Sequence, residues 1–137
     1  MDYVLAYVIG SFGGYAFERA QGKQHCDRLA KHAGLGCWPT LQVYGAGLVL
    51  LLFLYRHVDL HIGLLALLAA ALLSLFECAA GHAATRLFGQ PGWHYAFPDA
   101  YCSGYNSLRI TMGWFLLSLL VFYIFQWLGI KRNATRE

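Results

Sequence analysis

Residues 62–84 read IGLLALLAAALLSLFECAAGHAA and form the most hydrophobic run of this 137-residue chain. A helix needs about 20 mostly apolar residues to cross the hydrocarbon core of a bilayer, and this run is long enough. Three further apolar runs flank it, so the expected membrane spans cover residues 3–20, 41–55, 62–84 and 108–128. We therefore predict an all-α, polytopic membrane protein with four transmembrane helices, built as a single membrane domain over residues 1–137.

The composition excludes most soluble classes of protein. Hydrophobic residues make up 58% of the chain and charged residues 12%, whereas a soluble domain carries about 25% charged residues. The chain is also too short for an ATPase domain or a large extramembrane catalytic domain. Its net charge of +3 is too small and too scattered to indicate nucleic acid binding. We expect an integral protein of the bacterial cytoplasmic membrane, with membrane lipid as a partner.

Two longer polar segments connect the spans. Residues 21–32 are expected to form a short helix at the membrane interface, before Gly34, Gly36 and Pro39 break the pattern. Residues 85–107 contain several glycines and prolines and are expected to form a loop that covers one end of the bundle as a lid. The positive residues are divided almost evenly between the two sides of the membrane, so they give only a weak prediction of the protein's orientation. We place both long loops on the cytoplasmic side.

Small residues recur along one face of two of the spans. This spacing allows a neighbouring backbone to approach closely. The residues are Ala6, Gly10 and Gly14, followed by Glu18, in the first span, and Ala66, Ala70, Ser74, Glu77 and Gly81 in the third.

Antiparallel connectivity brings polar residues from different spans to one end of the bundle, beneath the 85–107 loop. A carboxylate at the middle of an apolar span costs roughly 2.5–3.5 kcal/mol on insertion scales, so Glu77 needs a partner. Arg109 is the expected partner because its planar fork holds a carboxylate with two hydrogen bonds. The expected ligand-binding residues are Glu18, Tyr44, Glu77, His82, Trp93, Tyr95 and Arg109.

Two interpretations of this polar cluster remain open. The functional one is a pocket that binds an ion, a proton or a lipid headgroup. The structural one is a buried ion pair between Glu77 and Arg109 that fixes the register of the helices.

The sequence gives little support for a metal or a cofactor, and we expect neither. His57 and His61 have a spacing that suits a metal, but they lie in a short turn where solvation at the interface explains them. A set of Glu77, His82, His94 and Asp99 offers nitrogen and oxygen ligands, yet no tight metal motif joins them.

The four cysteines, Cys26, Cys37, Cys78 and Cys102, form no C-x-x-C motif. Cys78 lies in an apolar run, where we expect it to pack as a small hydrophobic residue. Cys37 and Cys102 would form a disulfide only if their side of the membrane is oxidising.

Several short motifs resemble those of a known family. Gly14-x-x-x-Glu18 is similar to the family's G-W-x-x-E, and PTLQVYGAG at residues 39–47 is similar to the family's G-P-x-x-P-I-Y-G-x-G from its first proline onward. The other matching residues are Phe76, Glu77, Gly81, Leu87, Phe88, Gly89, Trp93, Tyr95, Gly104, Leu108, Arg109 and Trp114. On these residues the chain resembles the family named Putative ABC-transporter type IV, small CmpB-like membrane proteins, over residues 8–125.

The chain departs from the family pattern at a few polar positions. His94 stands where the family has aspartate, Trp38 and Gln42 replace a glycine and a proline, and Tyr101 replaces an asparagine. The resemblance therefore does not imply, for this chain, any role that needs a carboxylate at position 94.

The resemblance implies a transport role by association. The chain has no nucleotide-binding motif, so it either needs an ATPase partner or is no ABC component. We expect a transporter-like or accessory subunit of a membrane complex, acting as a homo-oligomer or with a partner membrane subunit. Two alternatives stay open: a membrane-embedded enzyme acting on a lipid or isoprenoid headgroup, with Glu77 or His82 as general base, and a purely structural subunit.

Overall fold

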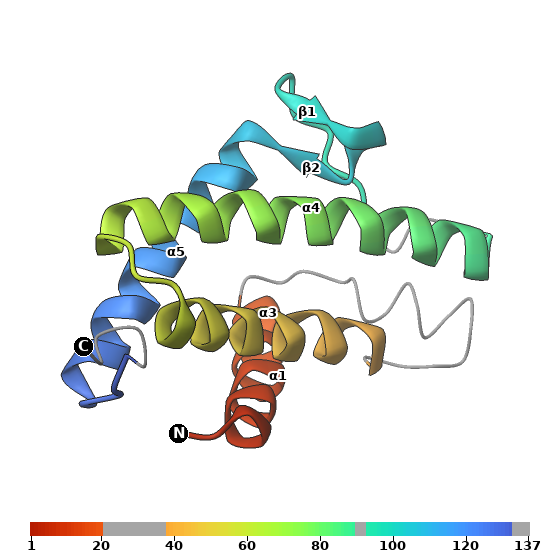
Figure 1. Cartoon of the computed structure of the whole chain (residues 1–137). Coiled ribbons are helices and arrows are strands. Elements are labelled where there is room, and N and C mark those ends of the chain that lie inside the picture. The colour runs from red at the N-terminus through yellow and green to blue at the C-terminus, as the bar shows by residue number, and fades with distance from the viewer. Residues whose placement is uncertain (21–37, 90–92, 133–137) are drawn as a thin grey trace.

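The computed structural model describes residues 1–20, 38–89 and 93–132. In this part of the chain the main elements are the helices α1 (Tyr3–Ala20), α3 (Trp38–His57), α4 (Ile62–Phe88) and α5 (Leu108–Trp127) (Figure 1). They coincide with the four apolar runs of the sequence. The helix expected over residues 21–32 lies outside the described residues.

The helices pack as two hairpins, α1 against α3 and α4 against α5. In Figure 1, α3 and α4 run side by side, and α5 crosses behind α4. The core forms where the end of α3, the start of α4 and the end of α5 meet. Its largest fully buried side chains include Leu52, Leu65 and Phe122, and the ring of Tyr55 packs on the rings of Phe122 and Phe125.

The predicted close approach of helices along the glycine stripe of α1 is confirmed. A Cβ atom added at Gly14 would overlap the ring of Tyr44, and one added at Gly10 would lie 2.8 Å from the carbonyl oxygen of Tyr44 and from Cβ of Leu48. The contact is mutual, because a Cβ on Gly45 of α3 would collide with Ser11 of α1. The backbones of α1 and α3 therefore meet at a distance that only glycine permits.

α4 continues beyond its expected end at residue 84 and stops at Phe88. Gly89 ends it in the left-handed conformation, with φ of 69°, which glycine adopts without steric cost. The lid segment is therefore shorter than the predicted residues 85–107.

The lid segment contains a small strand pair, which an all-α prediction did not include. β1 (Ala100–Tyr101) and β2 (Asn106–Ser107) are antiparallel and are joined by the 3-10 turn η1 (Cys102–Gly104). Asn106 is fully buried and donates its side-chain amide to the carbonyl oxygen of Ser74 at 3.4 Å. Ser107 then caps α5 by accepting a hydrogen bond from the backbone N–H of Ile110. As a result α5 begins beside the middle of α4, and the lid covers the second half of α4.

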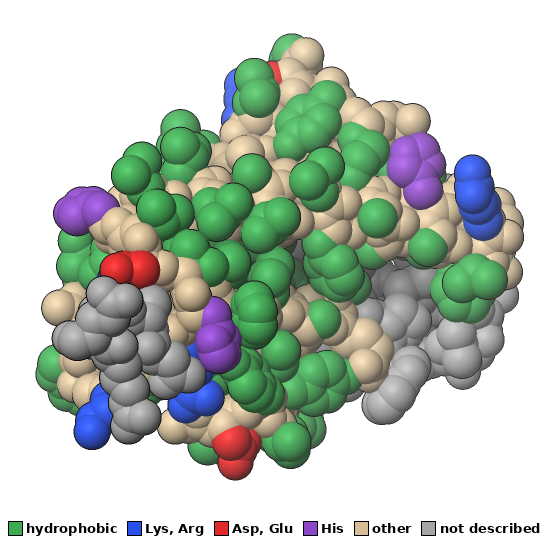
Figure 2. All heavy atoms as spheres, in the orientation of Figure 1, with side chains coloured by type: hydrophobic (Ala, Val, Ile, Leu, Met, Phe, Trp, Pro, Cys, Tyr) green, Lys and Arg blue, Asp and Glu red, His purple; other side chains and the backbone are tan. Residues whose placement is uncertain are grey.

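Many large hydrophobic side chains are exposed at the molecular surface. On the face drawn in Figure 2 they cover the middle, while charged side chains lie toward the margins. Large apolar side chains are exposed on every helix, for example Phe12 on α1, Phe53 on α3, Leu67 on α4 and Leu120 on α5. Among the described residues, α4 and α5 are the two helices long and apolar enough to cross a membrane by length and composition; α1 and α3 fall short of that measure.

Candidate functional site

A cavity of about 600 Å³ lies between the two helical hairpins. Residues of α1, α3, α4, α5 and the lid all contribute to its walls. The walls are mostly apolar and include Ile9, Phe17, Leu48, Leu51 and Leu117. Six of the seven expected site residues line this cavity, namely Glu18, Tyr44, Glu77, Trp93, Tyr95 and Arg109. The structure therefore brings these six side chains together; whether they bind a ligand stays a prediction.

Glu77 provides a buried carboxylate in the cavity wall contributed by α4. Its side chain is 6% exposed. Oε1 accepts a hydrogen bond from the Tyr95 hydroxyl at 2.9 Å, and Oε2 accepts one from Nε1 of Trp114 at 2.8 Å. The lid and α5 thus each supply a neutral donor to the same carboxylate, which offsets part of the cost of its burial.

Tyr95 remains a hydrogen-bond donor over the whole physiological pH range. Burial of its phenol, and then the nearby carboxylate of Glu77, raise the pKa of Tyr95 far above its ordinary value. The hydroxyl proton therefore stays on Tyr95 and points at Glu77.

Glu18 provides the second buried carboxylate, on the opposite side of the cavity. It is 3% exposed and lies one turn beyond Gly14 on the packed face of α1. Its Oε1 accepts a hydrogen bond from the hydroxyl of Tyr44 on α3 at 2.9 Å. The same tyrosine thus fills the space over Gly14 and binds the glutamate that follows it.

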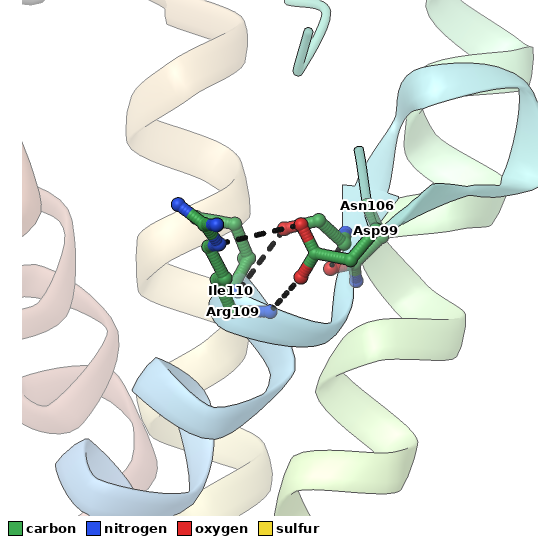
Figure 3. A network of polar contacts seen from close by, with 5 residues as sticks. Asp99, Asn106, Arg109 and Ile110 are labelled. Carbon is green, nitrogen blue, oxygen red and sulfur yellow. Dashed lines mark hydrogen bonds and ion pairs between the residues drawn. The ribbon is translucent and has the colours of Figure 1, made fainter. Parts of the chain in front are cut away.

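Arg109 lies at the rim of the cavity and pairs with Asp99 of the lid (Figure 3). Its Nε is 3.4 Å from Oδ1 of Asp99, its backbone N–H donates to Oδ2 at 2.9 Å, and its guanidinium lies over the ring of Phe97. The predicted pair between Arg109 and Glu77 is therefore wrong. Because the Arg109 side chain is 66% exposed in its pair with Asp99, the guanidinium keeps most of its hydration.

His82 is the expected site residue that the structure leaves out of the cavity. It is exposed on another face of α4, where its Nε2 is 3.6 Å from Sγ of Cys102 and its ring packs edge-on against Tyr105. The offset of five positions from Glu77 to His82 turns the two side chains about 140° apart on a helix. His82 and Glu77 therefore cannot act on one group in the cavity.

Cys78 and Cys102 form a disulfide that ties α4 to the lid. The prediction that Cys78 is a simple packing residue was wrong. The partner of Cys102 is Cys78, so the disulfide considered with Cys37 does not form; Cys37 itself lies outside the described residues.

The other histidines weighed as metal ligands have different contacts. His57 shares a hydrogen bond with the hydroxyl of Tyr3, and His61 caps α4 by accepting from the backbone N–H of Gly63. The set of Glu77, His82, His94 and Asp99 does not converge, because Glu77 faces the cavity and Asp99 pairs with Arg109. Among the described residues, the three that do converge as a potential ligand set are Cys78, His82 and Cys102.

Trp114 is the main site residue that the sequence analysis did not assign. It reaches Glu77 from α5 because that helix crosses α4 at this level. The signal was available in the sequence, since Trp114 closes the Gly104–Leu108–Arg109–Trp114 pattern of the resemblance.

Comparison with known proteins supports the resemblance. The sequence pattern of the family described as Putative ABC-transporter type IV matches residues 5–135, nearly the whole chain. No match is found among curated proteins or among solved structures. Together with the two helices able to cross a membrane, this match indicates an ABC-transporter-related membrane protein. The chain belongs to the Putative ABC-transporter type IV family.

Proposed function

We propose that the chain is a multi-pass subunit of a transport-related complex in the bacterial cytoplasmic membrane, and that its cavity binds a lipid-like molecule. In this proposal all four helices cross the membrane. The apolar part of the ligand lies between the two helical hairpins, and its polar headgroup lies at the two glutamates beneath the lid.

The shape of α1 and the pattern of its side chains support a membrane-crossing role for it. Its 18 residues span about 27 Å, close to the roughly 30 Å of a bilayer core. Val4 and Phe12 are more than half exposed and do not line the cavity, as expected for side chains that contact lipid. Its buried carboxylate, Glu18, lies on the cavity side.

The size and chemistry of the cavity support a small amphipathic ligand. Pockets for small molecules have volumes of about 300–1,000 Å³ and combine apolar walls with a few polar groups. This cavity has both properties, with about 600 Å³ and mostly apolar walls. Two tyrosine–glutamate pairs, Tyr44 with Glu18 and Tyr95 with Glu77, form its polar part.

The Glu77 group is the observation that carries this proposal. A carboxylate that accepts hydrogen bonds from Tyr95 and Trp114 is rigidly held in an apolar wall. Carboxylates favour a headgroup that donates hydrogen bonds or carries positive charge, such as an amine. Arg109 is not part of this group, because it pairs with Asp99 at the rim.

A partner is part of the proposal. A chain with no nucleotide-binding motif does not supply the energy for ATP-driven transport. We therefore propose that the chain works as a homo-oligomer or beside a partner membrane subunit, with an ATPase as a separate chain if the complex is an ABC transporter.

The proposal is tested with a substitution that fills the cavity, followed by a measurement of bound lipid. Gly113 lines the cavity, and a Cβ atom added there would meet nothing within 4 Å. Gly113→Leu should therefore occupy the cavity without disturbing the helices. The matched control is Met112→Leu, at an exposed neighbouring position that does not line the cavity.

Native mass spectrometry of the purified chain measures the retained lipid. We expect wild type and Met112→Leu to carry lipid and Gly113→Leu to lose it, with about a tenfold drop in occupancy or more, equivalent to at least 1.4 kcal/mol of binding. Glu77→Gln should lower the retention of amine lipids more than that of others. Equal lipid retention in Gly113→Leu and Met112→Leu would show that the cavity is not a lipid site.

A further inference from the structure

Three side chains with ligand atoms for soft metals meet at the outer face of α4, away from the cavity. Cys78 and His82 are four residues apart on α4, so they share one helical face. Cys102 of the lid reaches the same face. Their two Sγ atoms and the histidine nitrogen all lie within 4.8 Å of one another.

We propose that Cys78, His82 and Cys102 form a redox-controlled zinc site. In the oxidised protein the two cysteines are joined as a disulfide, and no thiolate is present to bind metal. In the reduced protein the two thiolates and the histidine bind one Zn²⁺. The set Cys₂His with an open fourth position is one that zinc adopts in proteins.

The exchange between the two states balances chemically. A dithiol reductant attacks the Cys78–Cys102 disulfide and is itself oxidised to a disulfide, while the two cysteines receive two electrons and two protons. When Zn²⁺ binds, both thiols release their protons to solvent and bind as thiolates. His82 binds through a neutral ring nitrogen.

The surroundings of the site favour a fixed geometry in both states. The ring of Tyr105 packs edge-on against the ring of His82 at 4.8 Å between centroids. Tyr105 is itself held by Thr85 of α4, at 2.5 Å between the hydroxyl oxygens. It fits against α4 because Gly81 has no Cβ there, and an added Cβ would collide with its ring. The backbone that brings the three ligands together therefore does not depend on the disulfide alone.

The site is open to its reactants. His82 is exposed, and both cysteines are partly exposed, so a reductant and a metal ion can reach them. The compartment then sets the state of the site. A reducing side of the membrane favours the thiols and metal binding, and an oxidising side favours the disulfide.

The experiment measures zinc binding by the full chain in detergent, before and after reduction. Cys26 and Cys37 are first replaced by serine, which leaves Cys78 and Cys102 as the two cysteines of the chain. Zn²⁺ affinity is measured by competition with a chromophoric chelator, and Co²⁺ serves as a second probe because thiolate ligation gives it a charge-transfer absorption band. Comparing oxidised and reduced samples of this one protein requires no further substitution.

We expect one Zn²⁺ per reduced chain and none per oxidised chain. His82→Ala in the same background should weaken binding by about tenfold or more, equivalent to at least 1.4 kcal/mol, and should alter the Co²⁺ spectrum. The matched control is His94→Ala, because His94 is also an exposed histidine of this region but lies outside the ligand set. The proposal is overturned if the reduced background protein takes up no zinc, or if His82→Ala and His94→Ala bind it equally well.

Discussion

The two helical hairpins each bury a carboxylate, but they hold it in different ways. In the α1–α3 hairpin the backbones meet across glycines, and Tyr44 of the adjacent helix binds Glu18. In the α4–α5 hairpin the donors to Glu77 come from a tyrosine of the lid and a tryptophan of α5. The first carboxylate therefore depends on how closely two helices pack, whereas the second depends on where the lid is anchored.

The largest expected difference between the hairpins follows from the disulfide that anchors the lid. Cys78 and Cys102 are 24 residues apart, and closing a loop of that size stabilises a fold by about 3 kcal/mol. Reduction in the presence of a metal chelator should loosen the lid and the second half of α4 but leave α1 and α3 unchanged. Hydrogen exchange measured by mass spectrometry checks this, and a uniform rise in exchange over all four helices would contradict it.

A second test is directed at the α1–α3 hairpin. Gly14→Val should cost about 3 kcal/mol of stability, because its side chain overlaps the ring of Tyr44 and overpacking costs up to about that much. Gly113→Val is the control, since it introduces the same β-branched residue where the space is open. Unfolding in mild detergent, followed by tryptophan fluorescence, should show a clear loss for Gly14→Val alone; equal losses would mean that glycine packing does not hold this hairpin together.

The hydrogen bond between Tyr95 and Glu77 should matter to an intermediate degree. Tyr95→Phe removes one donor from a buried carboxylate, and hydrogen bonds to charged groups contribute about 1.5–3 kcal/mol. Trp114 still binds the other oxygen of Glu77, so we expect a loss of about 2 kcal/mol. Tyr123→Phe serves as the control because Tyr123 is 57% exposed on α5. If both variants unfold like wild type, the lid does not stabilise Glu77.

The smallest effect is expected at the rim. Arg109→Ala removes an ion pair whose arginine side chain is 66% exposed, and exposed pairs contribute about 0–1 kcal/mol. Salt should weaken what remains of this contribution. Asp99→Ala should cost more, because it also removes the acceptor of the Arg109 backbone N–H at the start of α5. The two variants would lose equal stability if the ion pair rather than this backbone hydrogen bond fixed the lid, because both variants remove the ion pair.

Much of the candidate site could be predicted because helix periodicity fixes which residues share a face. The stripe Ala6–Gly10–Gly14–Glu18 and the burial of Glu77 both follow from spacing and from the cost of a charge in an apolar helix. The partner of Arg109 could not be found that way. Asp99 reaches it through a strand pair in the lid, and the spacing within helices carries no information about how such a loop folds back.

The disulfide shows the same limit. The spacing of Cys78 and His82 makes them neighbours on one helical face, but Cys102 joins them through the turn of the lid at Cys102–Gly104, where all three residues have positive φ. The position of His82 along α4 predicts that it lies near the pocket. Its angular position around the helix instead directs it to another face of α4.

The sequence by itself determined that the protein has four long apolar helices, which of their faces carry small residues, and that two glutamates must be buried. These properties depend on composition and on the 3.6-residue period, which act locally. Only the tertiary structure decided which donors bind those glutamates, which acid pairs with Arg109 and which cysteines meet. Such pairings depend on how α5 crosses α4 and how the lid closes, and they are set by packing among residues far apart in the chain.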